Sequence, residues 1–303
     1  MSRERTLVDV RNDIDAIDDR IHDLLIRRTE LVKEVRSIKS GWRVKIQPSR
    51  EADIVYRLME RHRGAFPKPD LVAIWRILIC ATLSFEGPFS VAVHLPERED
   101  GYWDIARDHF GPCTPIARHP SARSVIEAVH RQDAIVGVLP MPRGDDANPW
   151  WPHILSTQAE TPKIIARLPF AGIGNANAAG LEALVICPVT VVPTGRDRSL
   201  FVIDIAKRLG LAQVGDALRA AGFETSLLIA SRGNASPEIW HYLVEVDGYL
   251  AADDPRLGQL RHEIGETIDR IVPLGAYARP LSADALGRAP AQMPTAGEQA
   301  AGG

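Results

Sequence analysis

Apolar residues recur along the first forty positions in steps that alternate between four and three. This spacing puts them on one face of an α-helix, and the series is Val10, Ile14, Ile17, Ile21, Leu24, Leu31, Val35 and Ile38. No Gly or Pro interrupts residues 7–40, so the pattern predicts a single helix of roughly 50 Å. Such a helix needs other long helices beside it, and a second subunit is one source of them.

Arg28 stands in this apolar seam where another apolar residue is due. Burying an unpaired guanidinium costs on the order of several kcal/mol, so Arg28 must meet an anion or reach water, with Glu30 and Glu51 as available partners. Lys39 follows eleven residues later and lies about 20° round the helix, on the same face. Arg11 points about 100° away from Arg28 and would serve a different pocket, or that of a partner chain.

The rest of the chain divides into segments of different character. Residues 1–87 read as helical throughout, with further helices at about 50–63 and 71–85. Residues 88–195 show a βαβ-type alternation, from "FSVAVHL" to "AIVGVLPM", followed by a weakly patterned stretch. Residues 196–280 follow the order βαββαβ, a ferredoxin-like arrangement. Residues 281–303 are rich in Ala, Gly and Pro, which predicts a disordered tail. The fold class is therefore multidomain, α followed by α/β and α+β.

The composition fits a water-soluble protein of about two or three domains, because 45% of its 303 residues are hydrophobic and 25% are charged. The net charge of −3 is spread evenly, which gives no electrostatic footprint for nucleic acid or a membrane surface. The N-terminus is charged and no apolar run approaches the ~18 residues of a membrane span. We therefore expect a cytoplasmic protein with no nucleic-acid or membrane partner.

The cysteines and histidines show no spacing typical of a metal site. Cys80, Cys113 and Cys187 are odd in number and form no CxxC pair, which argues against a disulfide framework and against zinc. The histidines that we considered have no carboxylate or second histidine at a ligand spacing; they are His109, His119, His130 and His241.

The stretch "VRNDIDAIDDRIHDLLIRRTELVKEVRSIK", followed by "PSREADIV", resembles the all-helical chorismate mutase family in its version fused to prephenate dehydratase. The resemblance covers residues 5–87. It implies an intertwined all-α homodimer that rearranges chorismate to prephenate without cofactor or metal. Arginines suit the two carboxylates of chorismate through planar bidentate hydrogen bonds, and a lysine suits its ether oxygen.

The same resemblance implies a role for each matching residue. Arg28, Lys39 and Glu86 would be catalytic, and the substrate-binding residues would be Arg11 of the neighbouring subunit, Arg50, Glu51, Gln47 and Thr82. Three positions depart from the usual family pattern, which often has Asp at Gln47, Ser at Thr82 and Gln at Glu86. Glu86 would have to be protonated there, because an ionised carboxylate would repel the negative charge that develops on the ether oxygen.

The other two segments resemble parts of prephenate dehydratases. "SLLIASRG" and "IVPLGAY" are similar to the ACT domain, which implies Ser231 and Arg232 as binding residues for an aromatic amino acid effector. The family's acidic residue and proline are missing beside them, which favours a structural, dimerising role. "YWDIARDHFG" and "SVIEAVHRQDAIVGVLP" resemble the catalytic region. Its "ENS" is replaced by residues 142–144 and its Thr-Arg-Phe motif by residues 196–199, so we interpret this segment as a truncated remnant without dehydratase activity.

The sequence thus predicts a chorismate mutase of the shikimate pathway that feeds phenylalanine or tyrosine synthesis. Two alternatives stay open. Isochorismate pyruvate lyase shares the helical fold and would be recognised by pyruvate release, and a regulatory pseudoenzyme would bind aromatic amino acids without catalysis. Retention of Arg11, Arg28, Lys39 and Arg50 together favours the enzyme.

Overall fold

The computed structural model of the chain describes residues 5–38, 41, 44–95, 100–158, 160–172, 174, 180–233 and 238–287, except for the side chain of Glu86. Lys39, the side chain of Glu86 and the predicted tail from residue 288 onward therefore lie outside the described part.

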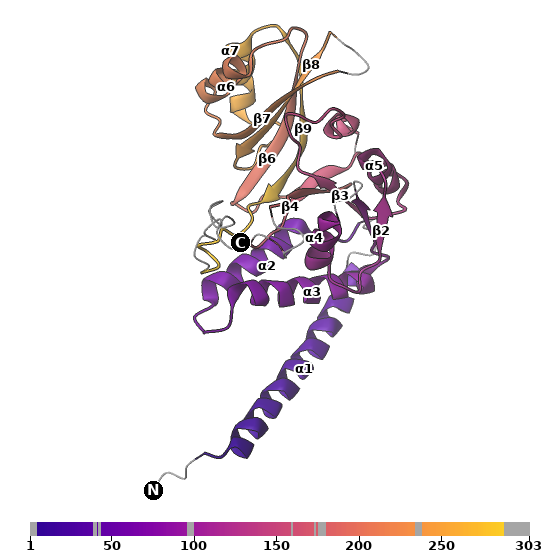
Figure 1. Cartoon of the computed structure of the whole chain (residues 1–303), viewed down its shortest axis with the longest axis vertical. Helices are drawn as coiled ribbons and strands as arrows, with labels where there is room; N and C mark the ends of the chain where they lie inside the picture. The colour runs from indigo at the N-terminus through magenta and orange to yellow at the C-terminus, as the bar shows by residue number, and fades with distance from the viewer. Residues whose placement is uncertain are drawn as a thin grey trace, which may run out of the picture.

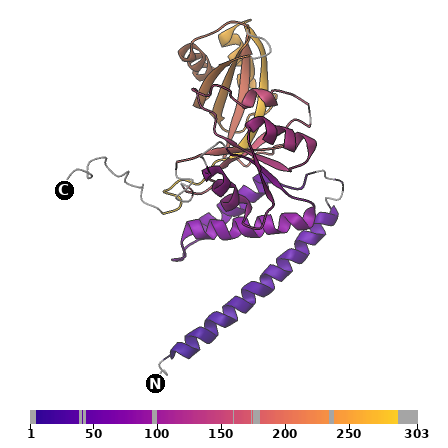
Figure 2. The same ribbon diagram turned by 45° about the vertical axis from the view of Figure 1, so that its right-hand side comes forward.

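The N-terminal region is helical, as predicted. It consists of α1 (Leu7–Ile38), α2 (Pro48–Arg61) and α3 (Lys68–Glu86). Helices α2 and α3 lie against the body of the molecule, whereas α1 projects away from it in both views (Figures 1 and 2). Pro48 occupies the first turn of α2, where its missing N–H costs nothing. No helix in the described residues is both long and apolar enough to cross a membrane.

A mixed sheet follows, and its nine strands have the order β2-β1-β3-β5-β4-β9-β6-β8-β7. Five strands come from the middle segment: β1 (Val91–His94), β2 (Ile116–His119), β3 (Val136–Pro140), β4 (Lys163–Leu168) and β5 (Ala183–Cys187). Strand β1 pairs in parallel with β2 and β3, and β5 runs antiparallel to β3 and β4. Helices α4 (Gly101–Phe110) and α5 (Ala122–Arg131) and the short helix η1 (Trp151–Ile154) accompany these strands.

The third segment has the predicted βαββαβ order. Its elements are β6 (Asp197–Ile205), α6 (Leu211–Ala220), β7 (Thr225–Arg232), β8 (Trp240–Asp247), α7 (Pro255–Ile264) and β9 (Ile268–Ala278). The strand order β9-β6-β8-β7 is antiparallel throughout. Both helices pack on one face, over a cluster that includes Phe201, Val214, Leu218, Tyr242 and Leu260. These features are those of a ferredoxin-like unit.

The hydrophobic core crosses the boundary between the middle and third segments. One cluster joins Ile164 and Leu184 of the middle segment to Leu200, Val272 and Tyr277 of the third, beneath α5 and η1. The opposite face of strands β1 to β5 packs on α3 and α4. The two segments therefore share one sheet and one core.

The two halves of the sheet meet where β4 and β9 run in parallel, and the register there pairs Ile164 with Gly275. Gly275 has φ = 142°, a value that L side chains rarely adopt. A Cβ at this position would lie 2.6 Å from the amide nitrogen of Ile164 and 2.9 Å from its carbonyl carbon, and closer still to the carbonyl oxygen. Only glycine allows the two backbones to approach this closely.

Replacing Gly275 by alanine should therefore separate β4 from β9. We expect Gly275→Ala to lower the free energy of unfolding by about 2–5 kcal/mol, from backbone strain and overpacking together. Gly248 is the matched control, because it has φ = 90° and a Cβ added there would meet no atom within 4 Å; Gly248→Ala should cost only the strain, about 1–2 kcal/mol. Urea denaturation measures both, and equal losses would contradict the role of close packing.

Candidate active site

Arg28 lies where α1 crosses α3. Its Nη1 donates to Thr82 Oγ1 at 3.2 Å and to the carbonyl oxygen of Leu78 at 3.2 Å. The side chain is half-buried, and this burial lowers the pKa of Arg28. The structure thus brings together two residues that the sequence predicted for one pocket, Arg28 and Thr82.

The two carboxylates that the sequence offered as partners for Arg28 are paired with other arginines. Glu30 pairs with Arg27 at 3.1 Å, and Glu51 pairs with Arg76 at 2.9 Å. No ion pair between described residues involves Arg28, whose contacts are a hydroxyl and a carbonyl. Within the described part of the chain, its positive charge at the crossing of two helices therefore has no anionic partner.

Gln47 and Arg50 meet at the start of α2. Both line a cavity of about 580 Å³, a volume typical of small-molecule sites. Residues 188–190, 192 and 193, which follow β5 in the middle segment, also line it. Ser49 Oγ donates to the carbonyl oxygen of Val192 across this contact. A segment outside the helical region therefore lines the cavity that holds two of the predicted residues.

Glu51 turns away from this cavity into a buried ion pair with Arg76 of α3. Glu51 is 7% exposed and Arg76 is 5% exposed. The other guanidinium nitrogens of Arg76 contact His109, with 2.8 Å between Nη2 and Nε2 and 3.2 Å from Nε to the carbonyl oxygen. Burial, and then the charge of Arg76, hold the pKa of His109 well below its usual range, so His109 is neutral and accepts a hydrogen bond from Arg76 at Nε2.

Arg76 and His109 were not among the residues predicted from the sequence. The sequence did contain a signal for Arg76, because this arginine interrupts the apolar stretch "AIWRILI" as Arg28 interrupts the seam of α1. Cys80 lies one turn later and contacts Arg76 at 3.7 Å, and burial raises the pKa of its thiol to about 12. Cys80 and Cys187 are buried, Cys113 is exposed, and all three are free thiols.

The remaining predicted residues lie apart from these contacts. Arg11 is exposed on the projecting part of α1. Ser231 and Arg232 end β7, which is the edge strand of the sheet. Lys39 and the side chain of Glu86 lie outside the described residues, so the structure does not bear on their predicted roles.

Residues 10–87 match the family model described as Chorismate mutase type II. This segment is a chorismate mutase type II domain. The match begins in α1 and ends after α3, so Arg28, Thr82, Gln47 and Arg50 all belong to the mutase domain.

Two curated relatives carry the name "Bifunctional chorismate mutase/prephenate dehydratase". The protein from Aquifex aeolicus (strain VF5) is 34% identical over 146 residues, which are 45% of this chain and 38% of the relative. The protein from Stutzerimonas stutzeri is 31% identical over 117 residues, or 37% of this chain and 32% of the relative. The chain thus spans about a third of the length of the curated relatives that it matches.

The solved structures that match include two with a TM-score of 0.46. One, titled "GqqA- a novel type of quorum quenching acylases", is 16% identical over 64% of this chain and 96% of its own. The other is prephenate dehydratase in complex with L-Phe from Arthrobacter aurescens, 12% identical over 63% of this chain and 90% of its own. Likenesses at this TM-score and identity assign no role to the chain.

Residues 196–199 stand where the sequence analysis expected a replaced dehydratase motif. Their side chains make hydrogen bonds and ion pairs within the chain. Asp197 accepts hydrogen bonds from Thr194 at 2.8 Å and from the amide of Gly195 at 3.0 Å. Ser199 Oγ donates to the carbonyl oxygen of Gly248 at 2.9 Å and accepts from the amide of Leu250 at 2.8 Å. These residues hold turns of the sheet together.

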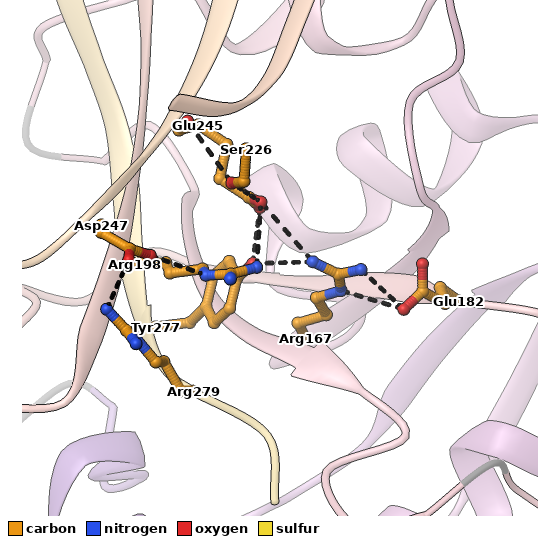
Figure 3. Close-up of polar contacts among 8 residues, drawn as sticks. All are labelled: Arg167, Glu182, Arg198, Ser226, Glu245, Asp247, Tyr277 and Arg279. Carbon is orange, nitrogen blue, oxygen red and sulfur yellow. Dashed lines mark hydrogen bonds and ion pairs between the residues drawn. The ribbon is translucent and has the colours of Figure 1, made fainter. Parts of the chain in front are cut away.

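Arg198 joins a network of charged side chains that spans the junction of the two sheet halves (Figure 3). At its centre is Glu245, 1% exposed, which accepts hydrogen bonds of 2.5 Å from both Tyr277 and Ser226. Arg167 and Arg198 each approach the same carboxylate at 3.5 Å. Glu182, Asp247 and Arg279 complete the network through ion pairs with these arginines or with each other. The network contains three cations and three anions, so its charges balance. Its ion pairs and hydrogen bonds connect β4, β6, β8 and β9.

One histidine pairs with a carboxylate on a neighbouring strand. His241 has a carboxylate partner, because its Nδ1 lies 2.5 Å from Asp204 Oδ1, whose other oxygen accepts from Arg270 at 2.5 Å. These residues sit opposite one another on adjacent strands, a proximity that sequence spacing does not reveal. In the described part of the chain, no group of three or more His, Cys, Asp or Glu residues could hold a metal ion.

The Glu51–Arg76 pair gives a stability test. Arg76→Met or Glu51→Gln should each lower the free energy of unfolding by about 3–5 kcal/mol, because each leaves a buried charge without its partner. The double variant should recover part of that loss, since it removes both charges. Chemical denaturation of the four proteins forms a double-mutant cycle, and strictly additive losses would contradict direct pairing.

Proposed function

We propose that this chain is a chorismate mutase, which converts chorismate to prephenate by a rearrangement that needs no cofactor. The observation that carries the proposal is the match of residues 10–87 to the chorismate mutase type II family. The names of the two curated relatives agree with it. The contact between Arg28 and Thr82 supports it as well, because two residues fifty-four positions apart meet as a shared pocket requires.

The chemistry accounts for the residue types. The rearrangement is pericyclic, so catalysis consists of holding the reactive conformer and stabilising the charge that develops on the ether oxygen. Arg28 and Arg50 would bind the two carboxylates, with Gln47 and Thr82 beside them. Lys39 and a protonated Glu86 would face the ether oxygen. In this assignment Glu51 shapes the pocket through its pair with Arg76 and is a positioning residue.

The active unit in this proposal is an intertwined homodimer. Along α1 the apolar seam is open to solvent in the single chain, with Ile14 51% exposed and Leu24 68% exposed. Contiguous apolar surface of this length marks an interaction site. Pairing with α1 of a second copy would cover the seam and bring Arg11 of the partner toward the pocket of Arg28.

We assign the remainder of the chain a structural role. The contacts of residues 197–199 leave no side chain there for dehydration chemistry, so prephenate should be released rather than converted to phenylpyruvate. The ferredoxin-like unit is an ACT-like module, and its edge strand β7 is open to pair with a second copy. Ser231 and Arg232, the candidate effector residues, lie on that edge.

The test is the disappearance of chorismate with purified protein, followed by chromatography of the product. We expect prephenate without phenylpyruvate. Arg28→Ala should lower kcat/KM by about a hundredfold or more, because a positioned charged donor is lost. Arg27→Ala is the matched control, since Arg27 is the neighbouring arginine, is exposed and pairs only with Glu30 among the described residues; its activity should stay within about twofold.

Each other outcome overturns a stated part of the proposal. Phenylpyruvate would refute the loss of dehydratase activity. Pyruvate released from isochorismate, with chorismate untouched, would make the protein a lyase. Equal losses in the two arginine variants would remove Arg28 from the site.

A further inference from the structure

Lys163, at the start of β4, is half-buried, and no described side chain balances its charge. Its Nζ donates to the carbonyl oxygens of Ser156 at 3.2 Å and Pro273 at 3.1 Å. No ion pair between described residues involves it. Desolvation lowers the pKa of Lys163, and no nearby carboxylate offsets this effect. Burying an ammonium in this way is unfavourable unless an anion joins it.

A cavity of about 310 Å³ adjoins this ammonium. Among the described residues that line it, Lys163 is the only charged one. Apolar side chains form much of the wall, namely Val189, Val191, Leu200 and Leu250, and polar ones stand at Thr157, Gln158, Thr190 and Tyr249. The volume lies at the lower end of the range for small-molecule sites.

We propose that this cavity binds a small organic carboxylate with an apolar body, whose carboxylate pairs with Lys163. An ammonium has three donors, and the carbonyl oxygens of Ser156 and Pro273 take two of them. The carboxylate accepts the third and supplies the missing negative charge. A single cation matches a monoanion, and the aliphatic walls match an apolar body better than a second charged group.

Residues 188–190 line this cavity and also the cavity that holds Gln47 and Arg50. The segment is anchored from both sides, because Tyr249 Oη donates to the carbonyl oxygen of Val191 at 3.2 Å and Ser49 Oγ donates to that of Val192. A ligand at Lys163 therefore touches the wall of the cavity with Arg50. This shared wall would let the carboxylate regulate the binding of chorismate, a role that rests on the proposed function.

Calorimetry on the full chain, without any activity assay, tests the binding. Phenylacetate and hexanoate serve as aromatic and aliphatic probes, and phenylacetamide is the uncharged match of phenylacetate. We expect saturable binding of at least one acid and none of the amide. Lys163→Met should weaken the binding about tenfold or more, and Lys163→Arg should retain more of it. Lys207→Met, at an exposed lysine after β6, is the control and should bind like the natural chain.

Absence of binding by both acids, or equal binding of acid and amide, would overturn the site. Unchanged binding of the acids by a folded Lys163→Met variant would also overturn the site. If that variant does not fold, the comparison of phenylacetate with phenylacetamide on the natural chain is the test. A second assay measures KM for chorismate with and without the bound acid. A change of about twofold or more that disappears in Lys163→Met supports the coupling, and an unchanged KM refutes it. A protein without mutase activity would refute the proposed function and leave the calorimetric result standing.

Discussion

The charge of Arg28 is the constraint on which the rest of the molecule depends. It sits in the apolar seam of α1, half-buried against α3, and its hydrogen bonds to described residues go to a threonine hydroxyl and a carbonyl. The two nearby carboxylates neutralise other arginines, Arg27 and Arg76. A guanidinium held in this way is poor for stability and well suited to an anionic substrate. In the proposed dimer, the same helix face would pack against a partner and present this charge to a ligand.

The helical domain is built into the body of the molecule. Residues of α2 and α3 share a hydrophobic cluster with Phe170, Ala278 and Leu286, and Tyr56 Oη donates to the carbonyl oxygen of Arg279 at 2.5 Å. The body itself is continuous, because Gly275 lets β4 and β9 join two sheet halves and the Glu245 network ties them on one face. Residues 188–193 then reach α2 from this body. The cavity with Arg50 thus has walls from two parts of the chain that are far apart in sequence.

Local patterns predicted the helices and the βαββαβ unit, because their periodicity records one buried and one exposed face. Strands β4 and β5 were missed because their sequences show no regular alternation of apolar and polar residues. Ala183–Cys187 is buried at every position, so no alternation of apolar and polar residues marks it. The short β2 was missed because it has only four residues, two of them exposed.

For the site, a single rule guided the choice of Arg28 from the sequence. A lone charge in an apolar element needs a partner, and that rule led to Arg28. The same rule holds for Arg76 in α3, Asp204 in β6 and Glu245 in β8, whose partners come from other elements. The sequence shows the need for a partner but not its identity, because tertiary packing decides which side chains meet. For this reason Glu51, expected to hold substrate, was found beside Arg76.

The central claim is that the seam of α1 brings Arg11 of one chain to the pocket of Arg28 in another. Complementation between two inactive variants tests it most directly. Arg11→Ala and Arg28→Ala proteins are each assayed alone, and then after mixing in equal amounts under conditions that exchange subunits. Half of the dimers are then mixed, and each mixed dimer has one intact site of two, so we expect recovery of about a quarter of the natural activity. No recovery, with mixed dimers verified by differently tagged chains, would contradict a site shared between subunits.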